Sequence, residues 1–219
     1  MRNRFDRQLQ QLNIELINMG NMIERAIELA VTAFVKQDAD KAKEAIEYDS
    51  EINAMERDIE TLCLKLLLEQ QPVAKDLRMI SSALKMITDM ERIGDHASDI
   101  SSITLEMINM DFIIQPEYIQ KMAIETTDML IRSINAYVNK DIELAQWVID
   151  HDDVVDELFN QAKSRLIKLI NENQDAGEQA TDMLMVAKYF ERIGDHATNI
   201  AEWVIFSITG AHVDDISTN

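Results

Sequence analysis

ERIGDHASDI occupies residues 91–100 of this chain, and ERIGDHATNI occupies residues 191–200. Eight of the ten positions are identical, and the two copies lie 100 positions apart in a chain of 219 residues. Chance acidic spacings do not produce eight identities in ten, even in an acidic chain. The repeat therefore predicts that the protein contains two copies of one structural unit.

The composition favours helices throughout, because the chain has only 5 Gly and 2 Pro and is 47% hydrophobic. No sustained alternation of apolar and polar residues predicts a strand. Apolar residues instead recur three and four positions apart, as on the buried face of a helix. We expect six helices: over 5–34, from Asp38 to about Gln71, from Pro72 to about Leu105, over 117–138, from Asp141 to about 170, and from about 178 to Gly210.

The helices divide into two sets of three, which predicts an all-α fold of two tandem three-helix bundles. Pro116 marks the junction, so we expect one unit over 1–112 and the other over 113–219. The short connection predicts that the halves pack together. Asp38 and Asp141 are expected as helix N-caps. Residues 171–175 and Gly177 are expected to form a turn, and Gly210 to end the last helix.

The net charge of −19 argues against binding nucleic acid or inserting at an anionic membrane, since both favour Lys and Arg. It permits the binding of cations and of basic protein partners. The single cysteine, Cys63, has no partner for an internal disulfide, which indicates a reducing compartment. No apolar stretch approaches the roughly 20 residues of a membrane span. We therefore expect a cytoplasmic protein.

Residues four apart are nearly stacked on a helix, so Glu91, Asp95 and Asp99 form one acidic column. The apolar side of the same helix lies opposite, which places the column outward. Asp49 and Asn53 flank the apolar seam of the preceding helix and can add oxygen ligands. The corresponding residues of the second half are Glu191, Asp195, Asn199, Asp152 and Asp156.

An open site of oxygen ligands suits hard cations, so we expect magnesium, manganese or iron. Stacked like charges repel one another, and a cation would offset that repulsion. The alternative is that each column is simply the solvated face of an acidic helix. The recurrence of Glu and Asp at matched positions in both halves favours a metal, although Asn199 lacks the charge of Asp99.

His96 and His196 follow Glu by five positions, whereas di-iron bundles use Glu-x-x-His, so we expect packing or hydrogen-bonding roles at the bundle edge. Gly94 and Gly194 lie within helices, where Gly costs about 1 kcal/mol, which predicts close approach of a neighbouring helix or ligand. Arg92 and Arg192 are expected to pair with carboxylates of an adjacent helix. No nucleophile–base pair, phosphate loop or zinc spacing predicts an enzyme.

These motifs resemble the PhoU family of phosphate-signalling proteins over nearly the whole chain. The resemblance rests on the two ERIGDHA segments, the acidic segments 49–53 and 152–156, and PVAKDLR at 72–78. It implies two three-helix bundles related by an internal pseudo-twofold repeat, and a regulator of phosphate uptake that restrains the phosphate-starvation response. It also implies metal binding on the acidic columns, including multinuclear clusters of iron or other metals. Asp76 and Arg78 have no counterpart in the second half, so we expect any partner or second-sphere role of theirs to belong to one half.

The partners implied by the resemblance are the ATPase subunit of the phosphate transporter and the phosphate-sensing histidine kinase. We also expect a homodimer. The competing hypothesis is a metal-storage or di-iron bundle protein, which the absent Glu-x-x-His and the outward carboxylates disfavour. Ferroxidase activity would distinguish the two, because an adaptor should lack it.

Overall fold

The structure is a computed structural model and describes residues 2–69, 72–108, 110 and 117–213. Over these residues the chain forms six α-helices and one short 3-10 helix, with no strand. The predicted all-α class is therefore confirmed. The elements are α1 (Arg2–Lys36), α2 (Ala39–Glu69), α3 (Ala74–Glu106), α4 (Glu117–Asn139), α5 (Ile142–Glu172), η1 (Gln174–Ala176) and α6 (Gly177–Thr209).

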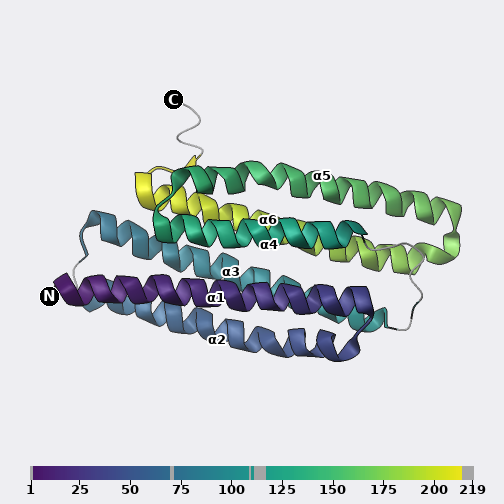
Figure 1. The fold of residues 1–219 in the computed structure, drawn as a ribbon, viewed down its shortest axis with the longest axis horizontal. Helices are drawn as coiled ribbons and strands as arrows, with labels where there is room; N and C mark the ends of the chain where they lie inside the picture. Colours follow the sequence, from purple (N-terminus) through teal and green to yellow (C-terminus); the bar gives the residue numbers. More distant parts are fainter. Residues whose placement is uncertain (1, 70–71, 109, 111–116, 214–219) are drawn as a thin grey trace.

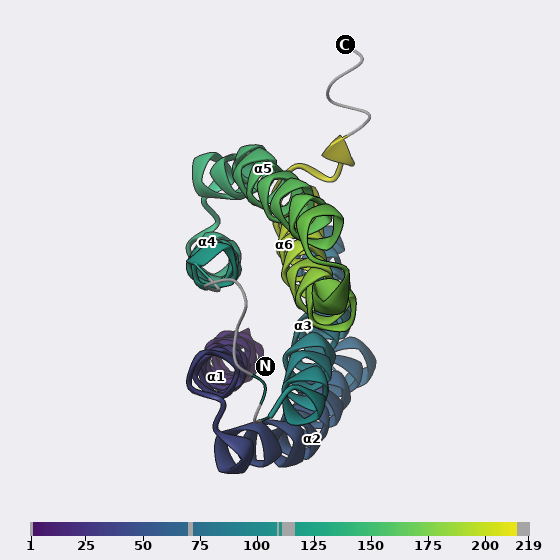
Figure 2. The same ribbon diagram turned by 90° about the vertical axis from the view of Figure 1, so that its right-hand side faces the viewer.

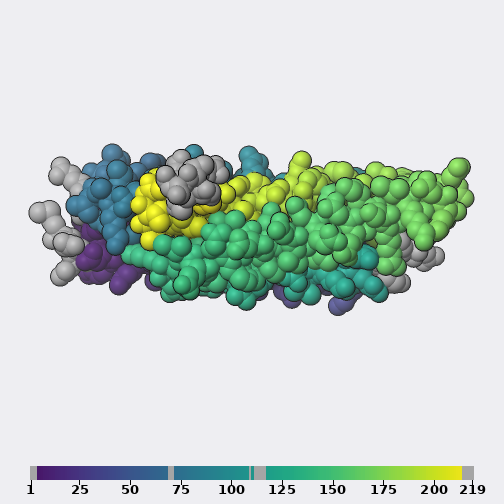
Figure 3. All heavy atoms as spheres, turned by 90° about the horizontal axis from the view of Figure 1, so that it is seen from above, coloured from purple at the N-terminus to yellow at the C-terminus, as the bar shows by residue number. Residues whose placement is uncertain are grey.

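All six helices run along the long axis of the molecule (Figure 1), and the space-filling view from above shows the same elongated shape (Figure 3). Figure 2 looks nearly down that axis and shows α2, α3, α6 and α5 in one row. α1 and α4 form a second layer on one side of the row, with α1 against α2 and α3, and α4 against α5 and α6. Each half is a three-helix bundle, which confirms the predicted tandem architecture. The halves meet along α3 with α6 and along α1 with α4.

α3 and α6 run antiparallel along their shared contact. The Nζ of Lys85 lies over the ring of Trp203, and Asp89 accepts a hydrogen bond from Asn199. In both pairs the two residue numbers add to 288, and a constant sum is what two antiparallel helices in one register give. The same register places Gly94 opposite Gly194 at the middle of the contact. The expected pseudo-twofold axis therefore passes between the two ERIGDHA segments.

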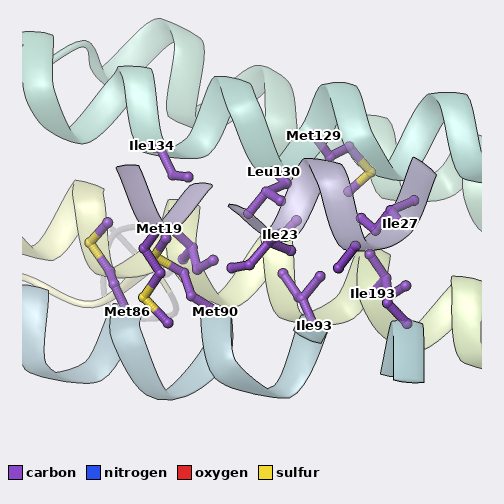
Figure 4. Packing of buried hydrophobic residues seen from close by; sticks show 14 of the residues in the cluster. Met19, Ile23, Ile27, Met86, Met90, Ile93, Met129, Leu130, Ile134 and Ile193 are labelled. Carbon is purple, nitrogen blue, oxygen red and sulfur yellow. The ribbon is translucent and has the colours of Figure 1, made fainter. Parts of the chain in front are cut away.

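One continuous hydrophobic core spans both halves. Figure 4 shows its centre, where side chains of α1 and α3 meet those of α4. Burying each such Leu, Ile or Met side chain contributes roughly 1.5–3 kcal/mol. The prediction that the halves pack together is confirmed, because their cores merge. The residues labelled there include Met19 and Ile23 of α1, Met86, Met90 and Ile93 of α3, Leu130 and Ile134 of α4, and Ile193 of α6.

Two predicted N-caps are present. Asp38 Oδ1 accepts hydrogen bonds from the backbone N–H groups of Asp40 and Lys41 at 3.1 and 3.0 Å. Asp141 Oδ1 accepts one from Leu144 N at 3.0 Å. These side chains satisfy backbone donors that have no partner within the first helical turn.

Gly210 ends α6 as predicted, in the left-handed conformation with φ of 80°. The prediction that Pro72 opens the third helix is wrong, because extended Val73 is the N-cap and α3 starts at Ala74. The turn predicted at 171–177 is shorter, since α5 continues to Glu172 and Gly177 already belongs to α6. The junction at Pro116, the helix limit at Gln71 and the unit boundary between 112 and 113 lie outside the described residues.

Candidate functional site

The first acidic face lies between α2 and α3. Asp49 of α2 is half-buried beside Glu91 and Asp95 of α3, and Asn53 donates a 2.9 Å hydrogen bond to Asp49 Oδ2. The other oxygen, Asp49 Oδ1, is buried without a hydrogen-bond partner. Burial, followed by the charge of Asp95, raises the pKa of Asp49 and also that of Glu91. The predicted ligands Asp49, Asn53, Glu91 and Asp95 are therefore brought together.

The second acidic face repeats this arrangement between α5 and α6. Burial, followed by the charges of Asp195, Asp156 and Glu191, raises the pKa of Asp152 to about 6. Burial and then Glu191 likewise raise the pKa of Asp195, against the opposing charge of Lys188. Lys188 forms an ion pair with Glu191, one turn earlier on α6. This face is thus partly neutralised from within its own helix.

The two mid-helix glycines set how closely the helices of each face approach. A Cβ added to Gly94 would lie 3.1 Å from two side-chain carbons of Ile52, between α2 and α3. A Cβ on Gly194 would lie 3.1 Å from Asp152 Oδ1 and 3.3 Å from a methyl of Val155. The predicted close approach is confirmed, and the neighbour is a helix in both halves. The missing Cβ of Gly194 also leaves room for the Asp152 carboxylate.

The third member of each column contacts the interface between the halves. Asp99 Oδ2 lies 3.5 Å from His96 Nδ1, and its charge acts on Tyr189 of α6. Asn199 donates a 3.1 Å hydrogen bond to Asp89 of α3. The columns therefore do not keep all three members on the outer face. Two acids per column remain with the acids of the neighbouring helix.

His96 and His196 lie where α3 crosses α6, with ring centroids 5.5 Å apart. His196 Nδ1 is 2.8 Å from Asp89 Oδ1, and the ring of His96 lies 5.3 Å from that of Tyr189. Burial lowers the pKa of His96, against the hydrogen bond to Asp99. The predicted packing and hydrogen-bonding roles are confirmed. Both histidines lie at the interface between the halves, where α3 contacts α6.

The expected pairing of Arg92 with an adjacent helix is wrong. Its guanidinium lies 2.8 Å from Asp95 and 3.6 Å from Glu91, both on α3 itself. Arg192 acts across the interface instead, where its charge lowers the pKa of His96 after the larger effect of burial. Side chains three positions apart are neighbours on a helix surface, so Asp95 is within reach of Arg92 before any carboxylate of another helix.

Asp76 and Arg78 do not support the acidic faces. Asp76 is in the first turn of α3, and Arg78 packs against Gly210 at the end of α6. At 1.5 Å per residue, Arg78 stands roughly 20 Å along α3 from Glu91. Both residues are therefore too distant to contact the acidic side chains of the first face.

The two acidic faces are not preformed metal chelates. Among the described residues, no three His, Cys, Asp or Glu side chains converge in an arrangement that holds a metal ion. Each face instead supplies carboxylates from two helices, half-buried and mutually repelling. Hard cations accept such oxygen ligands together with water. Asp156 is exposed and stands at the rim of the second face.

Sequence reasoning missed three residues of this region: Asp89, Lys188 and Tyr189. Asp89 and Tyr189 occupy equivalent positions of the repeat, and both face the histidine of the opposite half. Because one is an acid and the other an aromatic residue, the sequence did not show that the two positions are equivalent. The signal that identifies them is the offset of 100, which places 89 and 189 seven residues before His96 and His196.

Comparisons with known proteins agree with this arrangement. The PhoU domain matches twice, over residues 16–104 and 119–204, once in each bundle. A phosphate-specific transport system accessory protein PhoU homolog of Clostridium acetobutylicum is 37% identical over 96% of both chains. The accessory protein PhoU of Escherichia coli K12 is 31% identical over 94% of this chain and 86% of its own.

Two solved structures share the fold. The crystal structure of PhoU from Pseudomonas aeruginosa superposes with a TM-score of 0.89 at 31% identity, covering 94% of this chain and all of its own. The phosphate transport system regulatory protein PhoU from Streptococcus pneumoniae gives a TM-score of 0.89 at 25% identity, covering 96% and 99%. Across the described helices, none is both long and apolar enough to cross a membrane.

Proposed function

The chain belongs to the PhoU family, and from this premise we propose that it regulates phosphate uptake as a metal-binding adaptor. It restrains the phosphate-starvation response in the cytoplasm, as a homodimer that contacts the transporter ATPase subunit and the phosphate-sensing histidine kinase. The names of its relatives support the phosphate-transport part, since they are accessory or regulatory proteins of that system. The acidic faces support the metal-binding part, because each gathers carboxylates from two neighbouring helices.

The observation that supports a metal ion most directly is a buried carboxylate oxygen of Asp49 that has no hydrogen-bond partner. Asp49 Oδ1 is buried and accepts no hydrogen bond, although an unsatisfied buried acceptor costs about 1–3 kcal/mol. The neighbouring charges of Asp95 and Asp99 make this environment still less favourable for a carboxylate. A hard cation would satisfy the oxygen and offset the repulsion in one step. The residue set therefore offers oxygen ligands for a metal ion, which would have to draw the carboxylates closer together than they stand in this structure.

Glu91, Asp95 and Asp49 would hold a cation in the first half, with Asn53 orienting Asp49 through its hydrogen bond. Glu191, Asp195 and Asp152 would do so in the second, with Asp156 at the rim. Asp99 and Asn199 interact with residues at the interface between the halves, so they would lie outside the first coordination sphere of a bound ion. When bound, a magnesium, manganese or iron ion supplies positive charge that ties α2 to α3 and α5 to α6.

The double variant Asp95→Ala with Asp195→Ala tests the metal sites. Elemental analysis of protein purified without chelator should show the bound metal lost, while circular dichroism shows unchanged helicity. Helicity survives because the apolar seam lies on another face of the same helices. The control variant, Glu60→Ala with Glu143→Ala, removes two exposed carboxylates elsewhere and should keep its metal. Unchanged metal in the first variant would mean that the acidic faces are merely solvated.

Deletion of the protein tests the regulatory role. The phosphate-starvation response should then switch on in phosphate-rich medium, read as phosphatase and transporter expression. A deletion strain with unchanged expression would reject the adaptor function. The metal-storage alternative is not favoured, since neither half carries Glu-x-x-His. Oxygen-dependent ferroxidase activity of the purified protein would reinstate it.

A further inference from the structure

A cationic aromatic surface lies where α6 ends beside α3. We call it the end patch and define it as Arg78, Lys85, Trp203, Phe206 and His212. Lys85 Nζ stands 5.9 Å from the centroid of the Trp203 ring. Trp203 meets Phe206 edge-on at 5.8 Å, and His212 stacks on Phe206 at 4.6 Å. The end patch is therefore one connected surface from two helices and the residues after α6.

Among the described residues, the two cationic side chains of the end patch, Lys85 and Arg78, have no acidic partner. By contrast, Arg92 and Arg132 are each paired within their own helix. Lys85 and His212 are exposed. The Nε of Arg78 is buried against the end of α6 and has no hydrogen-bond partner. The guanidinium is thus held in place without being neutralised.

The internal repeat shows that packing does not require this surface. At an offset of 100, the counterparts of Arg78, Lys85, Trp203 and Phe206 are Glu178, Met185, Ile103 and Glu106. That opposite end is acidic: burial, followed by Glu106 and Glu178, raises the pKa of Asp182 there. The same α3–α6 contact therefore forms with the opposite charge and without aromatic rings. The end patch departs from the repeat for a reason other than the fold.

We propose that the end patch is a docking site for an acidic segment of a partner protein. Trp and Arg side chains anchor protein interfaces more often than other residues, because they bury large areas and keep a polar contact. Here the aromatic rings supply the apolar area, and Arg78, Lys85 and His212 supply donors for carboxylates. The site goes beyond the proposed function and does not depend on the acidic faces.

The net charge of −19 decides between an acidic segment and an anionic membrane. Charges beyond about 8–10 Å are screened at physiological salt. A short segment covering the end patch therefore experiences mainly the local cations. A planar anionic surface would also face the acidic body around the patch and be repelled. Of the two, the peptide segment is the occupant that the charge distribution favours.

Trp203 provides its own reporter of binding. The chain has 2 Trp, and the other, Trp147, stacks on His151 beneath Arg132, away from the patch. In a Trp147→Phe background, a short peptide of Glu and Leu should change the Trp203 fluorescence saturably. A peptide with Lys in place of Glu should not. The response should weaken as salt is raised, since screening reduces contacts between exposed charges.

The variant Arg78→Gln with Lys85→Gln should weaken the Glu/Leu peptide at least about fivefold, at unchanged helicity. The matched control, Lys43→Gln with Lys65→Gln, removes two exposed cations elsewhere and should change affinity less than about twofold. Equal weakening in both variants, or the absence of a saturable response, would overturn the proposal.

Two other occupants are tested in parallel. Phosphatidylserine vesicles bound with the same dependence on Arg78 and Lys85 would replace the peptide segment by a membrane. Dissociation of a homodimer by the same double variant, seen in sedimentation, would show that a second copy covers the patch. Neither the metal content nor the deletion phenotype enters these measurements, so failure here leaves the proposed function standing.

Discussion

Replacing Asp152 by Asn should stabilise the metal-free protein at neutral pH. The pKa of Asp152 is raised from 3.8 to about 6 by burial and by the acids around it. A difference of about 2 pKa units corresponds to roughly 3 kcal/mol as an upper limit. Because the side chain is only half-buried, solvent screening reduces this to about 1 kcal/mol. Asn keeps the shape and removes the charge that its neighbours repel.

The effect has a defined pH window. Between pH 4 and about 6 the native protein binds the Asp152 proton more tightly than the unfolded chain, so this residue's contribution to stability falls as pH rises. Below pH 4 both states are protonated, and the variant should match the parent. Above about pH 6 the full difference should appear. For a domain of this size, about 1 kcal/mol corresponds to roughly 2–4 °C in Tm.

Thermal unfolding followed by circular dichroism, with chelator and at pH 4 and 7.5, measures this difference. Asp153→Asn is the matched control, since it removes an exposed carboxylate from the next position and should shift Tm by less than about 1 °C. Added manganese should stabilise the parent more than the Asp152 variant, because a ligand stabilises only the state that binds it. A Tm lowered at pH 7.5, or raised equally at both pH values, would refute the reasoning.

Two further predictions concern the core. Gly94→Val should destabilise the protein by about 1–3 kcal/mol in urea unfolding, because even an added Cβ at Gly94 lies 3.1 Å from Ile52. The control is Gly177→Val, which should cost less because no atom lies within 4 Å of a Cβ added there. Cys63 should resist alkylation by iodoacetamide at pH 8 until the protein unfolds, since burial raises the pKa of its thiol to about 12. Rapid labelling of the native protein would contradict the buried position of this thiol.

The sequence by itself determined the repeat, the six helices and most of their ends. These features depend on local chemistry: apolar spacing defines a helix face, Asp38 and Asp141 accept the free N–H groups of a first turn, and Gly210 adopts a left-handed φ. The close approach at Gly94 was also predictable, because a mid-helix Gly has a local energetic cost that only a neighbour offsets. The partial site of Asp49 with Glu91 and Asp95 followed from helix geometry and the repeat.

The tertiary structure alone decided how the two halves join. Asp89 meets His196, and Lys85 meets Trp203, because α3 and α6 run antiparallel in one particular register. That register places Asp99 and Asn199 at the interface between the halves, whereas the sequence predicted them in outward columns. Periodicity along one helix states which residues share a face but not which residues of another helix lie opposite. Contacts between residues more than 100 positions apart are fixed only when the shared core sets the crossing of the helices.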